Sequence, residues 1–352
     1  MSPHWKRWLW NAAKIIAAAL ILFFAGKQLL GDLEKLNVDW SDSGAVLALV
    51  PQPLWFIPSA LLYLLALLPS VWYWRHLHHH FGYPLDAYVS IRSHYIGQVG
   101  KYVPGKALAL AMRAALTHPY GVPYGVSVII SFYEVLTSMA AGGFVAALIY
   151  VVDPPALSDQ LEVAPGWQLD PQWAGLILMG LCGIPLLPGV FNFVVAKMTA
   201  NIQAFELYRL PPVRYVTLLL GMLATAGGWW VQGLSMWAML QAVLPNPPAL
   251  TLSSAAQCTA AIAFANVAGF VIIVVPGGLG VREYLLKVLL SFAGPEGLIA
   301  FAAIVLRLLW ILSEALLALI LYFVRPKPPP EPASPAREGP VDIASIAPPT
   351  GA

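Results

Sequence analysis

The sequence has 352 residues, of which 59% are hydrophobic and only 10% are charged. Soluble domains carry about 25% charged residues, so this composition excludes a soluble globular protein. The net charge of +2 is not accompanied by a basic soluble region, which argues against a nucleic-acid partner. Apolar runs of about 20 residues, long enough to cross a bilayer, recur along the chain. We therefore expect an all-α polytopic membrane protein.

Six full spans are predicted in chain order, at 8–30, 54–74, 124–152, 172–195, 214–243 and 297–324. The first follows Lys6 and Arg7 and has no small-residue cleavage site after it, so we interpret it as a signal-anchor that is retained. Cys182 and Cys258 both lie in predicted membrane segments, which argues against a disulfide framework. The tail over 326–352 is rich in Pro, Ala and Glu, and we expect it to be disordered and cytoplasmic.

Two further segments, 86–117 and 254–293, are each interrupted by a Pro-Gly pair. Proline donates no backbone hydrogen bond and disfavours helix at the residue before it. A helix that restarts after the break has unpaired N–H groups, which in a membrane must face protein, water or a ligand. We therefore predict two broken, re-entrant helical hairpins.

The distribution of basic residues predicts the orientation. Loops 31–53, 153–171 and 244–253 contain one basic residue, Lys35, whereas the N-terminus, loops 75–85 and 196–213 and the tail contain eight. By the positive-inside rule both termini are then cytoplasmic, and the two hairpins enter from opposite faces. Pro276 lies 172 residues after Pro104, and the order of span, span, hairpin, span occurs twice. We predict a transmembrane domain over 1–325 with an inverted repeat of halves 8–152 and 172–324, an architecture of secondary transporters.

The first hairpin contains four basic residues and no acidic residue between Arg92 and Arg113. Lys101 and Lys106 flank the break at Pro104 and Gly105. A helix start with nearby lysines suits an anionic headgroup, phosphate above all. For Arg92 and Arg113, the alternative is that they snorkel to the cytoplasmic headgroups. The first break is thus predicted to bind a headgroup.

The second break is richer in glycine. Consecutive backbone N–H groups in such a stretch can form an anion-binding concavity, and two charged residues open the following helix. The alternative is an external turn between two ordinary spans. The predicted binding residues here are Pro276, Gly277, Gly278, Gly280, Arg282 and Glu283.

Three charges lie inside predicted spans: Glu134, Arg307 and Glu314. Ionisable groups in spans usually face the bundle interior and mark a substrate or ion path. The alternative is a structural pair, Glu134 with Arg307, that clamps the two repeats. The His-rich stretch 75–80 sits at a span end, and we predict no metal site or cofactor there. Tryptophans near span ends are interpreted as an interfacial belt: Trp5, Trp8, Trp10, Trp72, Trp74, Trp229 and Trp230.

PGGLGVRE at 276–283, YIGQVGKYVPGKALALAMR at 95–113, Glu134 and the LRLL around Arg307 together resemble the membrane domain of lysylphosphatidylglycerol synthase/flippase proteins. The resemblance covers about residues 8–324. It implies a lipid-translocating domain, with the family's Pro-Gly-Gly and Arg-Glu on 276–278 and 282–283. Members often carry Glu-Arg where this chain has Glu134-Val135. We expect the aminoacyl-transferring domain of the fused members to be absent, because the sequence ends in the tail.

The leading functional hypothesis is therefore a flippase in the cell (inner, cytoplasmic) membrane. It would move an anionic or aminoacylated phospholipid, or a lipid-linked precursor. The alternatives are a membrane-embedded lipid-modifying transferase, whose candidate carboxylates are Asp39 with Asp42 and Asp153 with Asp159, and an accessory scaffold for such an enzyme. No catalytic or nucleotide-binding motif is found. The expected partners are the bilayer and the lipid, and both a homo-oligomer and a neighbouring lipid-modifying enzyme are compatible with the sequence.

Overall fold

The computed structural model describes residues 50–102, 107–154, 161–164, 167–169, 176, 180, 187–199, 211–271 and 281–324. This part of the chain is helical apart from one short antiparallel hairpin, in which Leu161 pairs with Leu169. The strands are β1 (Leu161–Ala164) and β2 (Trp167–Leu169). The α-helices are α3 (Phe56–Ala66), α4 (Leu68–His80), α5 (Ala87–Gln98), α6 (Ala107–Thr117), α7 (Tyr124–Val152), α9 (Pro188–Thr199), α11 (Tyr215–Val243), α12 (Leu252–Val271), α13 (Val281–Leu289) and α14 (Glu296–Phe323). Short 3₁₀ turns occur at η1 (Pro53–Trp55), η2 (Val99–Tyr102), η3 (His118–Tyr120) and η6 (Ser291–Ala293).

Three of the described helices are long and apolar enough to cross a membrane: Pro53–His80, Tyr124–Val152 and Glu296–Phe323. The first is α3 and α4 in near-continuous succession, with Pro69 in the first turn of α4. Helix α11 has the same length as α7, 29 residues. At 1.5 Å per residue such a helix is about 44 Å long, well above the roughly 30 Å of a hydrocarbon core.

The predicted spans at 54–74, 124–152, 214–243 and 297–324 correspond to these helices. The first is longer than predicted, because the His-rich stretch continues α4 to His80. Of the predicted span 172–195 only part is described, and α9 continues four residues beyond its predicted end. The predicted span 8–30 and the tail over 326–352 lie outside the described residues.

Each predicted broken segment has helices on both sides of its Pro-Gly pair. The first consists of α5, the turn η2 and α6, and the second of α12 and α13. With 12 and 11 residues, α5 and α6 are each about 17 Å long, too short to cross the hydrocarbon core. Both Pro-Gly pairs lie in gaps of the described chain.

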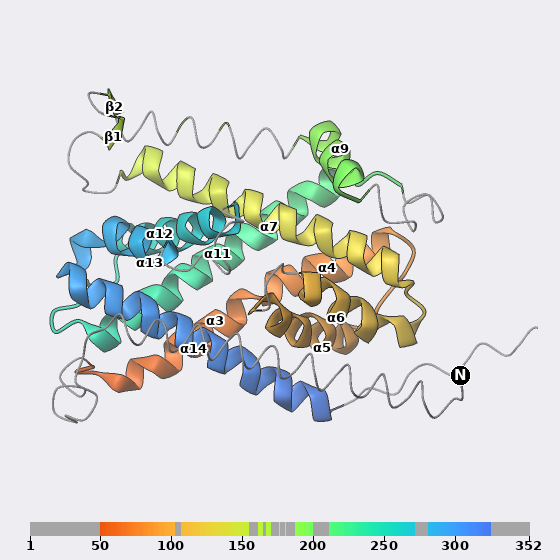
Figure 1. Ribbon diagram of the computed structural model, residues 1–352, viewed down its shortest axis with the longest axis horizontal. Helices are drawn as coiled ribbons and strands as arrows, with labels where there is room; N and C mark the ends of the chain where they lie inside the picture. Colours follow the sequence, from red (N-terminus) through yellow and green to blue (C-terminus); the bar gives the residue numbers. More distant parts are fainter. Residues whose placement is uncertain are drawn as a thin grey trace, which may run out of the picture.

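The two helix pairs occupy opposite ends of the molecule (Figure 1). Helices α5 and α6 lie at one end of the long helices, and α12 and α13 lie at the other. The packing is reciprocal: α5 packs against α14 and α6 against α7, whereas α12 packs against α7 and α13 against α14. Each helix pair thus contacts the last long helix of both halves. The inverted repeat itself stays a prediction.

Helix α11 crosses the centre of the molecule and packs against α3, α4, α7, α12 and α14. Its buried residues join those of α7, α12 and α14 in the largest hydrophobic cluster. Small residues let the backbones approach closely, as at membrane helix contacts generally. A Cβ atom on Gly233 would lie 2.5 Å from the Cα atom of Thr259 in α12.

This contact makes a test of the packing possible. We expect Gly233→Ala to lower the free energy of unfolding by about 1–3 kcal/mol, because the added methyl group meets backbone that must move. Gly227→Ala in the same helix is the matched control, since a Cβ atom there meets nothing within 4 Å. Thermal unfolding in detergent, followed by circular dichroism, measures both. Equal stability of the two variants would contradict this packing of α11 on α12.

Two predicted interfacial tryptophans are instead part of the protein interior, so the belt interpretation is wrong for them. Trp74 is fully buried and its indole N–H donates to the hydroxyl of Ser131 at 3.0 Å. Trp229 is 5% exposed and donates to the carbonyl of Ser138 at 2.8 Å. Both tryptophans connect α7 to a neighbouring helix, which gives the indole N–H the partner that a buried tryptophan needs.

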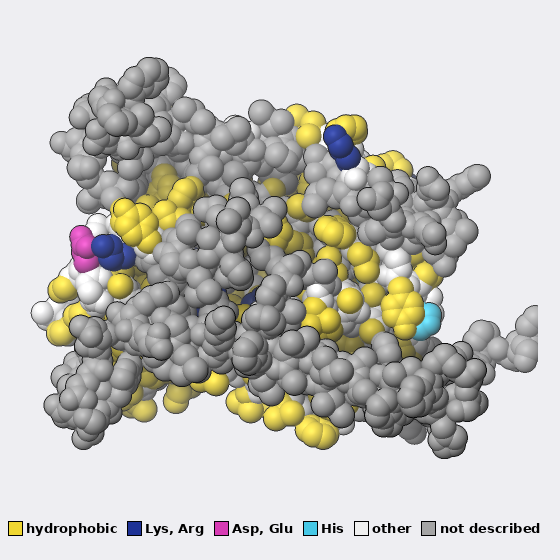
Figure 2. Space-filling view, viewed as in Figure 1, with side chains coloured by type: hydrophobic (Ala, Val, Ile, Leu, Met, Phe, Trp, Pro, Cys, Tyr) yellow, Lys and Arg dark blue, Asp and Glu magenta, His cyan; other side chains and the backbone are white. Residues whose placement is uncertain are grey.

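The outer surface is apolar. In the view of Figure 2, hydrophobic side chains cover much of the described surface, and few charged side chains are visible. Large exposed hydrophobic residues are frequent on α3, α11 and α14, among them Leu61, Leu223 and Leu316. An exposed apolar surface of this extent is typical of contact with lipid.

Candidate functional site

Within the described residues, buried charged side chains form two clusters. The first, the Glu134 cluster, comprises His94, Arg113 and Glu134. Arg113 Nη1 donates to Glu134 Oε2 at 2.7 Å, and both side chains are at least 96% buried. His94 is fully buried, with its Nε2 atom 3.6 Å from Glu134 Oε1. These residues come from α5, α6 and α7, so the ion pair connects the first hairpin to the long helix that follows it.

Tight packing surrounds the Glu134 cluster. The guanidinium carbon of Arg113 lies 5.8 Å from the ring centroid of Trp74. A Cβ atom on Gly97 would lie 2.5 Å from Arg113 Cγ, so the glycine makes room for the arginine stem. On α7, Ser127 and Ser131 are buried on the same face as Glu134. The arginine is therefore held on all sides by the protein.

Sequence reasoning left two interpretations open here. Snorkelling of Arg92 and Arg113 is wrong, because they are 7% and 2% exposed, and Arg92 Nε donates to the carbonyl of Leu321. A Glu134–Arg307 clamp is also wrong: the ion-pair partner of Glu134 within the described residues is Arg113. This interpretation assumed that the partner of Glu134 lies in the other half of the chain, whereas Arg113 is only 21 residues away in sequence.

The second cluster, the Glu314 cluster, comprises Tyr63, Lys101, Tyr102 and Glu314. Lys101 Nζ donates to Glu314 Oε1 at 2.5 Å and to the hydroxyl of Tyr63 at 3.0 Å. Tyr63 also donates to Glu314 Oε1, and the Tyr102 hydroxyl donates to Oε2 at 2.9 Å. One carboxylate thus receives three donors, which is close to the hydrogen-bonding capacity of a buried carboxylate.

Helices of both halves build this cluster. Tyr63 lies in α3, Lys101 and Tyr102 form the end of η2 just before the first break, and Glu314 lies in α14. Glu314 is fully buried at its side chain, whereas the side chain of Lys101 is 34% exposed. The carboxylate is therefore enclosed, whereas about a third of the lysine side chain is accessible.

Aromatic rings extend the Glu314 cluster toward the second break. The Tyr63 ring is stacked on Trp310 with centroids 4.2 Å apart. The guanidinium of Arg282, near the start of α13, lies 4.6 Å from the Trp310 ring centroid, within cation–π distance. Lys101, before the first break, and Arg282, after the second, thus both lie against the Tyr63–Trp310 stack.

Of the predicted site residues, Lys101 and Glu314 meet in one cluster, Arg282 lies near it against Trp310, and Glu134 lies in the other cluster. Arg307 is buried on α14, seven residues before Glu314. Glu283 lies in α13, with its side chain outside the described part. Outside the described residues lie Pro104, Gly105, Lys106, Pro276, Gly277, Gly278 and Gly280.

Sequence reasoning missed Tyr63, Tyr102 and Trp310 as members of the site. A signal existed for Trp310, because it lies three residues after Arg307 and four before Glu314, on one helical face. Tyr102 follows Lys101 directly at the break. No comparable signal marked Tyr63, which is 251 residues from Glu314.

The His-rich stretch has no role in either cluster. His78 is buried and its Nδ1 atom lies 2.9 Å from the carbonyl of Trp74, one turn earlier. Within the described ranges, no group of three or more His, Cys, Asp or Glu side chains is placed to hold a metal ion. Asp153, a candidate for transferase chemistry, accepts a hydrogen bond from Ser253 and joins α7 to α12.

Fold and site together define a helical membrane protein with buried charges gathered around two interrupted helix pairs. The sequence matches the family of the lysylphosphatidylglycerol synthase TM region over residues 11–324. The chain therefore belongs to this family, which confirms the resemblance and indicates a membrane role related to lipids. No curated protein matches the sequence.

Proposed function

We propose that this protein is a flippase that moves a lipid with an anionic headgroup between the leaflets of the cell membrane. One observation carries the proposal: a partly exposed lysine and two tyrosine hydroxyls converge on Glu314, and an arginine lies nearby against Trp310. These are donors that bind phosphate well. Here they surround a carboxylate, which presents the same kind of charged oxygen atoms as a phosphate group.

In this proposal the Glu314 carboxylate occupies the donors that would otherwise bind the phosphate of the headgroup. With no lipid bound, its carboxylate neutralises Lys101. When a phosphate approaches, it competes for the same donors and releases Glu314. A binding site that is occupied by its own carboxylate avoids leaving a lysine unpaired inside the membrane, which would be costly.

The arrangement of the helices supports alternating access. We propose that the two halves form the inverted repeat predicted from the sequence, with both termini cytoplasmic and the hairpins entering from opposite faces. The reciprocal packing of α5 on α14 and of α12 on α7 is what such a repeat requires. Rocking of one half against the other would then expose the Glu314 cluster to each leaflet in turn.

We further propose a transporter rather than an enzyme. Transferase chemistry at Asp153 would need a free carboxylate, whereas this side chain is hydrogen-bonded in a helix contact. An accessory scaffold would not need donors gathered on a buried carboxylate.

Lipid movement in proteoliposomes tests the proposal. We expect the purified protein to accelerate the transfer of fluorescent anionic phospholipids to the outer leaflet. Quenching of their fluorescence by a membrane-impermeant reductant measures this transfer. Protein-free liposomes and a zwitterionic lipid are the controls. Transfer rates equal to those of protein-free liposomes for several anionic lipids would overturn the proposal.

A further inference from the structure

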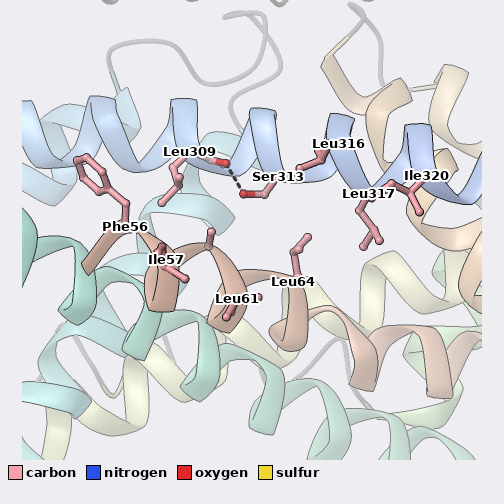
Figure 3. A pocket seen from close by; sticks show the side chains of 10 residues that line it. Phe56, Ile57, Leu61, Leu64, Leu309, Ser313, Leu316, Leu317 and Ile320 are labelled. Atoms are coloured by element: carbon pink, nitrogen blue, oxygen red, sulfur yellow. Dashed lines mark hydrogen bonds between the residues drawn. The ribbon is translucent and has the colours of Figure 1, made fainter. Parts of the chain in front are cut away.

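An apolar groove lies between α3 and α14 (Figure 3). Its volume is about 350 Å³, which falls within the range of about 300–1,000 Å³ for ligand pockets. The lining side chains are Phe56, Ile57, Ala60, Leu61 and Leu64 from α3 and Leu309, Ser313, Leu316, Leu317 and Ile320 from α14. Several of them are more than half exposed.

The groove offers hydrocarbon and almost nothing else. Among the described lining residues the one polar side chain is Ser313, whose hydroxyl donates to the carbonyl of Leu309 in the same helix at 2.6 Å (Figure 3). This bond satisfies the hydroxyl within α14. A polar ligand would therefore find no hydrogen-bond partner among these side chains. A hydrocarbon chain makes no hydrogen bonds, so it would lose none on entering the groove.

The groove and the Glu314 cluster occupy adjacent faces of the same two helices. On α3, Leu64 lines the groove and its neighbour Tyr63 donates to Glu314. On α14, Ser313 lines the groove and its neighbour is Glu314 itself. A ligand that spans one helix pair would thus have its hydrocarbon part in the groove and its charged part near Lys101, whose side chain is one-third exposed.

We propose that this groove seats an acyl chain of an anionic diacyl lipid while its phosphate takes the place of Glu314 on Lys101. The inference rests on the proposed function and adds the hydrophobic contact of the same site. Burying a methylene group is favourable when it leaves water, but gives little in a bilayer, where the chain is already in hydrocarbon. The groove therefore positions the chain, and the headgroup supplies the specificity.

Photo-crosslinking tests the groove. The probe is phosphatidylglycerol with a photoactivatable acyl chain, compared with phosphatidylcholine that carries the same chain, each in proteoliposomes of the full chain. We expect the anionic probe to label peptides of α3 and α14 at least fivefold more than the zwitterionic probe. An excess of unlabelled phosphatidylglycerol should remove the difference.

Tryptophan substitutions that fill the groove can be compared with one at a similarly exposed position outside it. Leu61→Trp and Leu316→Trp enlarge side chains that are 55% and 62% exposed, so the fold has room for them. We expect each to reduce the labelling difference about fivefold. Leu223→Trp on α11, at a position 63% exposed and outside the groove, should leave it unchanged.

The outcomes separate this inference from the proposed function. Equal labelling by both probes, or labelling that unlabelled lipid does not remove, would mean that bulk lipid fills the groove and would overturn the inference. Labelling absent from α3 and α14 would overturn it as well, because another occupant, such as residues 8–30, would then cover the groove. Headgroup-dependent labelling without lipid movement would support the groove and overturn the flippase. Lipid movement that neither tryptophan variant changes would support the flippase and overturn the role of the groove.

Discussion

Arg113→Met is expected to lower the free energy of unfolding by about 3–5 kcal/mol, because it removes one partner of a buried ion pair and leaves the Glu134 carboxylate without its cation. Arg113 and Glu134 are 2% and 3% exposed, so little water reaches the stranded charge. Methionine retains most of the volume of the arginine stem beside Gly97, which limits the cavity. Unfolding by a denaturing detergent, followed by circular dichroism, measures the loss.

The double variant R113M/E134L shows whether the loss comes from the charge. We expect it to recover most of the stability, since replacing a complete buried pair by apolar groups is often neutral or stabilising. Lys287→Met is the control for an exposed pair, because its partner Glu296 is 68% exposed, and its effect should be small. A double variant that is no more stable than R113M would contradict an energetic coupling between the two side chains.

The sequence patterns predicted the long helices closely. Helix α7 begins and ends at the predicted residues, and α14 differs by one residue at each end. Long apolar runs bounded by proline or a charged residue carry this information locally, because a membrane helix must satisfy its backbone within itself. The predicted helix boundary was wrong where polar residues continue the helix. The predicted span 54–74 stops before the His-rich stretch, although α4 continues because His78 packs inside the protein.

The pairing of the buried charges could not be predicted in the same way. Periodicity places Glu134, Arg307 and Glu314 on interior faces of their helices, but it does not say which helix lies opposite. Glu314 meets Lys101, which is 213 residues earlier. That contact depends on α5 packing against α14, a tertiary arrangement that one sequence does not encode locally. The tyrosines were missed for the same reason, because their hydroxyl groups gain a role only through this packing.

The two clusters differ in the accessibility of the basic partner. In the Glu134 cluster both charges are enclosed, so exchanging either partner would require the first hairpin to separate from α7. In the Glu314 cluster the lysine is accessible while the carboxylate is enclosed. Only the second arrangement lets an external anion reach the cation without unfolding the site. Under the proposed function, Arg113 would thus have a structural role and Lys101 a binding role.

Lys101→Met and Glu314→Gln are expected to change the affinity for an anionic lipid in opposite directions. Lys101→Met removes the cation that would hold the phosphate, and a charge-assisted hydrogen bond contributes about 1.5–3 kcal/mol, so the dissociation constant should rise roughly tenfold or more. Glu314→Gln removes the competing carboxylate but keeps the size of the side chain, so the affinity should increase. Transport should fall in both variants, because the glutamine no longer displaces the bound phosphate.

Binding of phosphatidylglycerol to the purified protein, measured by native mass spectrometry, separates this mechanism from a structural ion pair. A purely structural pair predicts weaker binding in both variants, because either substitution would loosen the contact of η2 with α14. Lys287→Met is a close control, since the side chains of Lys287 and Lys101 are 32% and 34% exposed and each is paired with a glutamate. It should leave the affinity unchanged. Weaker binding by Glu314→Gln, with the thermal stability of the wild type, would rule out competition between Glu314 and the headgroup for Lys101.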